Sequence, residues 1–183
     1  FPVLFALDLF LEGSEENDTL QGKAGNDTLL GRDGNDSLSG GGGDDILQVG
    51  SGASLLEGGA GDDLLKFEYG EHSLFGGEGY DTLDGESGSA TLYGGGGNDI
   101  IGMDYGVLLA SGGAGDDRLT GPEGGEATLY GGLGNDTLSG RYGTYRLFGG
   151  DGDDSLSGHG LLDGGNGADS LRGTDDSDET LKG

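Results

Sequence analysis

The residues with the clearest chemical potential are aspartates that recur at a nearly constant spacing. One series, separated mostly by 18 residues, consists of Asp27, Asp45, Asp63, Asp81, Asp99, Asp117, Asp136, Asp154 and Asp169. Asp18 and Asp36 begin a second series with the same spacing. Carboxylate oxygens are hard ligands that suit calcium, and stacked like charges are unfavourable without cations between them. We therefore expect these aspartates to bind several Ca²⁺ ions, whereas simple capping of turns would not require such stacks.

Groups suited to catalysis are scarce. The only histidines are His72 and His159, and neither has an obvious partner at close spacing. The chain has no cysteine, which removes thiol nucleophiles, thiolate metal sites and disulfides. No nucleophile elbow, HExxH helix or phosphate loop is present. Adjacent acids such as Asp44 and Asp45 could serve as an acid and a base, but they recur too regularly to mark a unique active site. We expect no enzyme and no organic cofactor.

A nine-residue repeat sets the spacing of the aspartates. Residues 22–30, 31–39 and 40–48 read GKAGNDTLL, GRDGNDSLS and GGGGDDILQ. The glycine-rich six residues favour a tight turn with positive φ angles, and the following three favour a short strand with an inward apolar residue. Two repeats then complete one coil, and stacked coils form parallel sheets around a thin apolar seam. The repeat predicts an all-β parallel β-roll, a β-solenoid of about ten two-strand coils.

Nearly the whole chain, from residue 13 to about residue 181, resembles the RTX (hemolysin-type) calcium-binding parallel β-roll family. The resemblance rests on the pattern Gly-Gly-x-Gly-x-Asp-x-apolar-x, repeated in fixed phase. It implies that calcium lies between successive loops, held by the repeat aspartates and backbone carbonyls. It also implies a chain that passes a type I secretion channel unfolded and folds outside the cell, so that we expect a secreted, extracellular or cell-surface location.

The two edges of the expected roll differ. The long aspartate series falls on one edge, whereas the other edge continues after Asp18 and Asp36 without carboxylates. Its later members at the same repeat position are Ser54, His72, Ala90, Leu108, Ala127 and Tyr145. An extra residue near Pro122 and the short segment 158–163 both fall in these degenerate loops. We expect one long calcium column, with at most one or two ions on the opposite edge near its start.

Aromatic residues occupy the outward last position of several degenerate repeats. They are Phe75, Tyr93, Tyr130 and Phe148, and Tyr69, Tyr105 and Tyr142 are expected to decorate the same edge. Stacked aromatics stabilise a parallel sheet through neighbour contacts. An apolar stripe left in water also favours a partner, here self-association with another rod, a covalently linked domain or a glycan. Both interpretations remain open at this point.

Composition and charge limit the remaining functions. The 183 residues include 47 glycines and 31% apolar residues, too few for an ordinary globular core. The formal net charge of -27 indicates cations as partners and argues against binding to nucleic acid or anionic membranes. The apolar run 1–11 is too short to span a bilayer and lacks the features of a signal peptide, so we expect no membrane span.

The expected organisation has two parts. Residues 1–12 form an apolar cap or contact strand, and residues 13–183 form the roll. Within it, 13–48 carry consensus repeats on both edges, 49–172 alternate between consensus and degenerate repeats, and 173–183 form an irregular end. This organisation fits three roles: a calcium-dependent structural module of a surface protein, adhesin or fibre, the secretion and folding module of a larger enzyme or toxin, and a self-assembling filament subunit.

Overall fold

The structure, a computed structural model, describes residues 7–173 and 180–183, and within them the chain forms strands and no helix. None of the described segments is therefore a helix long and apolar enough to cross a membrane. The strands are β1 (Phe10–Glu12), β2 (Thr19–Gln21), β3 (Thr28–Arg32), β4 (Ser37–Gly42), β5 (Ile46–Gly52), β6 (Leu55–Ala60), β7 (Leu64–Glu78), β8 (Thr82–Gly96), β9 (Ile100–Ala114), β10 (Arg118–Thr120), β11 (Glu126–Leu133), β12 (Thr137–Ser139), β13 (Thr144–Asp151), β14 (Ser155–Gly158), β15 (Gly160–Asn166), β16 (Ser170–Gly173) and β17 (Thr180–Lys182).

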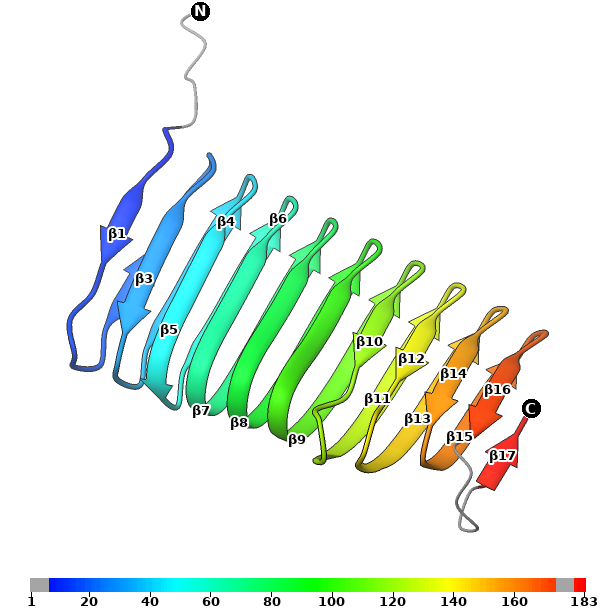
Figure 1. Cartoon of the computed structure of the whole chain (residues 1–183). Coiled ribbons are helices and arrows are strands. Elements are labelled where there is room, and N and C mark those ends of the chain that lie inside the picture. The colour runs from blue at the N-terminus through cyan, green and yellow to red at the C-terminus, as the bar shows by residue number, and fades with distance from the viewer. Residues whose placement is uncertain (1–6, 174–179) are drawn as a thin grey trace, which may run out of the picture.

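The strands stack as a parallel β-solenoid, which confirms the predicted fold class. Each strand pairs in parallel with the strand one coil away, and β7 and β8 are aligned with Leu64 opposite Thr82 and Leu74 opposite Leu92. The register therefore advances by 18 residues per regular coil. The roll makes about nine turns, slightly fewer than the ten expected. The turns stack along one axis into the narrow, ladder-like rod seen in Figure 1.

The two edges of the ladder are built differently. Strands β7, β8 and β9 each run for 15 residues from one face, around one edge, to the other face. These continuous bends form the lower edge in Figure 1, and tight turns form the upper edge. The tight turns require glycine, because Gly59 and Gly61 have φ angles of 123° and 127°. A β-carbon on either residue would also collide with a carbonyl oxygen of the preceding coil.

The core is a single seam of inward side chains, one from each strand segment. Leu65, Leu74, Leu83 and Leu92 are at most 1% exposed and represent the pattern along the rod. Burying one leucine stabilises the fold by roughly 2 kcal/mol. The seam is therefore continuous but only one side chain deep between the sheets, so that the loops must contribute the remaining stability.

Two irregular coils interrupt the regular period. The coil from Asp117 to Asp136 spans 19 residues, and the coil from Asp154 to Asp169 spans 15. The extra residue lies in a turn around Pro122, and the shortened coil places Gly160 beside Tyr145. Both changes occur on the lower edge, as the sequence predicts, and the tight turns keep their length.

The ends of the described chain complete the ladder. Strand β1 pairs with β3, with Phe10 opposite Thr28, and β17 pairs with β15, with Thr180 opposite Leu161. Residues 1–6 and 174–179 lie outside the described residues. The cap expected for residues 1–12 and the irregular end expected for residues 173–183 therefore stay predictions.

Candidate metal-binding edges

The long aspartate series lies along the edge of tight turns. Its members from Asp27 to Asp154 are at most 2% exposed, and Asp169 is partly exposed. Each follows the glycine-rich turn and precedes a strand, so that its side chain turns inward between coils. The structure thus brings the predicted residues into one buried column.

Hydrogen bonds connect the column from coil to coil. The amide of Asp45 donates to Oδ1 of Asp63 at 2.7 Å, and the amide of Asp63 donates to Oδ1 of Asp81 at 2.8 Å. The same bond repeats from Asp27 to Asp45, Asp81 to Asp99, Asp99 to Asp117, Asp117 to Asp136, Asp136 to Asp154 and Asp154 to Asp169. One carboxylate oxygen of each aspartate is therefore used in holding adjacent turns in register.

The second carboxylate oxygen has no partner in most members of the column. Buried Oδ2 atoms without a hydrogen bond belong to Asp45, Asp63, Asp81, Asp99, Asp117, Asp136 and Asp154, and to Asp36 on the other edge. An unpaired buried carboxylate oxygen is strongly unfavourable. A row of such atoms requires a cation or a proton to compensate for the lost hydration.

A backbone oxygen faces the same space as most of the unpaired Oδ2 atoms on this edge. At Gly76, the position that a β-carbon would take lies against Oδ2 of Asp81 and 2.7 Å from the carbonyl oxygen of Gly94. We call this combination an oxygen pair. The same pair surrounds the first glycine of other repeats on this edge, namely Gly22, Gly40, Gly58, Gly94, Gly131 and Gly149. Only glycine leaves this space open, which explains the first glycine of the repeat.

Electrostatics show the same need for positive charge. Burial raises the pKa of Asp63 and Asp117 to about 7, and that of Asp81 and Asp136 to about 6. The hydrogen bond from the neighbouring amide opposes this rise, and repulsion between stacked carboxylates adds to it. Without a cation, the folded column therefore resists ionisation near neutral pH.

A second hydrogen-bond ladder runs beside the first in the opposite sense. The amide of Asp62 donates to Oδ1 of Asp44 at 3.0 Å, and the amide of Tyr80 donates to Oδ1 of Asp62 at 2.8 Å. Asn26, Asn98, Asp116, Asn135 and Asp153 accept in the same way. Asparagine and aspartate both occur in this series, because the ladder needs a side-chain acceptor but no charge, and Tyr80 interrupts it. The sequence analysis did not predict this ladder.

The opposite edge retains one oxygen pair at its start. A β-carbon on Gly13 would approach Oδ2 of Asp18 at 2.6 Å and the carbonyl oxygen of Gly31 at 2.9 Å. At Gly31 itself, the neighbour beyond Asp36 is instead a methyl group of Val49, at 2.9 Å. An apolar side chain thus lies where the second oxygen pair of this edge would need a carbonyl oxygen, and the one or two ions expected here stay a prediction.

Beyond this point the edge is filled with uncharged side chains. The amide of Asp36 donates to Oγ of Ser54, and the amide of Ser54 donates to Nδ1 of His72 at 3.2 Å. Nε2 of His72 then donates to the Tyr69 carbonyl, while burial lowers the pKa of His72 and keeps it neutral. The ladder therefore persists for two coils without carboxylates.

Two large rings, of Phe67 and Tyr145, fill parts of this edge, and the packing of Phe67 there was not predicted from the sequence. The Phe67 ring contacts His72 at a centroid distance of 4.7 Å and fills the space above Gly85. The Tyr145 ring fills the space beside Gly140. Its hydroxyl oxygen lies 2.6 Å from the Pro122 carbonyl oxygen and 2.8 Å from the Arg141 carbonyl oxygen, so that it can donate a hydrogen bond to either. The sequence feature that could have predicted such a ring is an apolar residue at the first position of the repeat, where glycine is usual, as at Phe67.

The predicted aromatic series forms two separate pairs, and is not a continuous ladder. Phe75 stacks on Tyr93 with centroids 5.1 Å apart, and Tyr130 stacks on Phe148 at 5.0 Å. Ser111 occupies the position between them and breaks the series, because it has no ring. The pairs also lie at the ends of strands that lead into the aspartate turns, since Gly76 directly follows Phe75. Phe75, Tyr93 and Tyr130 are 39–44% exposed.

The oxygen pairs fit calcium better than any softer metal. No group of three or more His, Cys, Asp or Glu side chains gathers as a metal site within residues 7–173 and 180–183. Each position therefore supplies one carboxylate, and backbone carbonyls must complete the ligand set. All these donors are hard oxygens, which is the ligand chemistry of calcium.

Fold and edge together define a class: a parallel β-roll with repeated oxygen sites between its turns. The profile of the RTX calcium-binding nonapeptide repeat matches residues 12–47, 39–66, 73–101, 109–138, 123–156 and 146–160, which together cover most of the chain. The chain therefore belongs to the RTX calcium-binding repeat family, and calcium binding by a β-roll is its supported activity. No curated protein matches the chain.

Proposed function

We propose that the chain is an extracellular structural module that folds when it binds calcium and serves a secreted surface protein, adhesin or fibre. The observation that carries the proposal is the row of buried Oδ2 atoms without partners, from Asp45 to Asp154. Such a row is unfavourable in a folded chain unless positive charge is bound beside it. The carboxylates of the long series, of Asp18 and of Asp36, with backbone carbonyls, would hold the ions.

Bound calcium supplies the positive charge that the column lacks. The unfolded chain cannot present the oxygen pairs, because each joins two coils that are 18 residues apart. Binding free energy therefore becomes folding free energy, about 2.7 kcal/mol for each site at a calcium concentration one hundred times the dissociation constant. The net charge of -27 opposes compaction without calcium.

This coupling supports secretion as the biological setting. Calcium is scarce in the cytosol and abundant outside cells, so that a chain of this kind would stay unfolded until it is exported. RTX repeat proteins typically leave the cell by type I secretion. The same physics suits the secretion and folding module of a larger enzyme or toxin, which is the alternative role.

The exposed aromatic pairs favour a contact role in addition. Phe75 with Tyr93 and Tyr130 with Phe148 present flat apolar surfaces beside the aspartate turns. A linked domain, a glycan or another copy of the chain in a filament would cover them. Replacing Phe75 and Tyr93 by alanine should abolish such contact while leaving calcium-induced folding intact.

A calcium titration tests the main proposal. Circular dichroism and small-angle scattering should report an expanded chain in a chelator and a compact β-rod at millimolar calcium, with magnesium as the control ion. A chain that keeps its β spectrum and its dimensions in the chelator would refute the coupling. Filaments that form only with calcium, seen by electron microscopy, would favour the assembly role.

A further inference from the structure

A hollow of about 870 Å³ lies on the edge opposite the calcium column, near the C-terminal end. It exists because the shortened coil passes directly from β14 through His159 into β15, where the preceding coil carries the longer turn that includes Arg141 and Tyr142. The missing residues leave a recess between coils. Its volume falls within the range of small-molecule sites, roughly 300–1,000 Å³.

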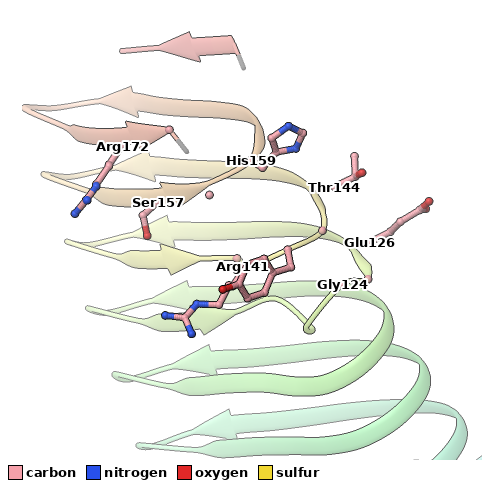
Figure 2. A pocket seen from close by; sticks show the side chains of 13 residues that line it. Gly124, Glu126, Arg141, Thr144, Ser157, His159 and Arg172 are labelled. Atoms are coloured by element: carbon pink, nitrogen blue, oxygen red, sulfur yellow. The ribbon is translucent and has the colours of Figure 1, made fainter. Parts of the chain in front are cut away.

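Two guanidinium groups stand on one side of this hollow. Figure 2 shows Arg141 and Arg172 extending in the same direction, with Ser157 between them. Ser157 pairs with Arg172 in the sheet, and Ser139, just before Arg141, pairs with Ser157. The two arginines therefore come from rungs roughly 10 Å apart. Within the part of the chain described, neither arginine forms an ion pair.

Tyr142 is the second unusual feature of the hollow. It is one of two described non-glycine residues with a positive φ, at 59°, and the residue is 79% exposed. A bulky side chain rarely adopts this backbone conformation. The Arg141 guanidinium lies over its ring, 5.7 Å from the centroid. The turn therefore holds an exposed ring beside a cation, at the rim of a recess.

The remaining lining is polar and carries the opposite charge. Glu126 and His159 lie on the side of the hollow away from the arginines (Figure 2). A ligand that fills the space must present an anionic group to the arginines and hydroxyl groups to Glu126, because a second anion there would be repelled. The net charge of -27 also disfavours a long polyanion.

We propose that the hollow binds a short acidic sugar, a uronic acid oligosaccharide. Its carboxylates pair with Arg141 and Arg172, since guanidinium forks match carboxylate geometry. Its hydroxyls bond Ser157, His159 and Glu126, and the apolar face of a sugar ring packs on Tyr142. This site is distinct from the calcium column and goes beyond the proposed folding function.

A titration of the calcium-saturated chain with digalacturonate tests the proposal by calorimetry and NMR shifts. Galabiose, the neutral disaccharide with the same linkage, should bind at least tenfold more weakly. The double variant Arg141→Ala, Arg172→Ala should weaken digalacturonate binding at least tenfold. Arg146→Ala removes an exposed arginine of the same region outside the hollow and should change nothing. In Tyr142→Asn, the asparagine tolerates the positive φ, and the variant should weaken the binding of both sugars.

Circular dichroism of the same samples separates the two proposals. If the chain does not fold with calcium, the folding function is contradicted. If it folds but does not bind digalacturonate, only the sugar site is contradicted. Equal binding of digalacturonate and galabiose, or full binding by the double arginine variant, also overturns it. Displacement by an equal concentration of sulfate would show an unspecific anion site and overturn the sugar assignment.

Discussion

Asp63 allows the metal-binding role to be separated from turn capping. Its Oδ1 accepts the amide of Asp45, and its Oδ2 is buried without a partner. The variant Asp63→Asn keeps an acceptor for the amide and removes the charge. If the aspartates only capped turns, asparagine would serve equally well. If they hold calcium, the substitution should have opposite effects with and without the ion.

The magnitude with calcium follows from the loss of one ion. The oxygen pair at Gly58 contains Oδ2 of Asp63 and the Gly76 carbonyl, so that asparagine removes its only charged ligand. A site that is saturated one hundredfold above its dissociation constant contributes about 2.7 kcal/mol. Weakening that site tenfold to one hundredfold should therefore lower the free energy of unfolding by about 1.3 to 2.3 kcal/mol.

Without calcium the sign reverses. The pKa of Asp63 is about 7 in the fold, against about 3.9 in an unfolded chain. At pH 7 this aspartate ionises more readily in the unfolded chain than in the fold. The pKa difference therefore favours the unfolded chain by about 4 kcal/mol at most. Solvent near the turn reduces this to about 1–2 kcal/mol. Asp63→Asn should stabilise the calcium-free roll by this amount.

The assays are urea unfolding followed by circular dichroism in millimolar calcium and, in a chelator at pH 7, the sucrose concentration needed to fold the otherwise unfolded chain. Asp62→Asn is the matched control, because it removes one charge from the same turn and keeps its own ladder acceptor. The control should show neither effect. Equal shifts of the two variants in calcium, or destabilisation by Asp63→Asn in both conditions, would refute the metal-binding role of the column.

Three further predictions test pH, glycine and the filled edge. Between about pH 7 and pH 4, the calcium-free roll should become more favourable as pH falls, because folded Asp63 and Asp117, with pKa near 7, bind protons that the unfolded chain does not. The sucrose concentration needed to fold the chain in a chelator should therefore be lower at pH 5 than at pH 7. Gly94→Ala should lower the free energy of unfolding by about 2 kcal/mol and weaken one calcium site, since its β-carbon would enter an oxygen pair. Gly96→Ala is the control, because its β-carbon would meet only the flexible Glu78 side chain, and it should leave a calcium titration unchanged. Tyr145→Phe should lower the free energy of unfolding by about 1–2 kcal/mol, equally at low and at high millimolar calcium, because the lost hydroxyl bonds only backbone carbonyls. Thermal unfolding at both calcium concentrations measures this.

The repeat determined the architecture without any structure. A nine-residue period with an inward leucine, as at Leu74 and Leu92, buries its apolar residues when the coils stack in register and pair parallel strands. The period also places Asp63 and Asp81 on one edge, because contacts between adjacent coils follow directly from spacing. The family match confirms the calcium chemistry, and the assignment of individual aspartates as ligands stays a prediction.

Contacts between coils decided what the repeat could not. The unpaired Oδ2 atoms, the oxygen pair at Gly76 and the closure of the second edge by Val49 depend on which atom of the next coil faces a given turn. The stacking of Phe75 on Tyr93 and of Tyr130 on Phe148 likewise depends on how the rings of adjacent coils are oriented. The sequence by itself thus determined the roll, its coil length and its charge, because these follow from a local period. Only the tertiary structure decided which oxygens lack partners and where a shortened coil opens a hollow, because both depend on packing between neighbouring turns.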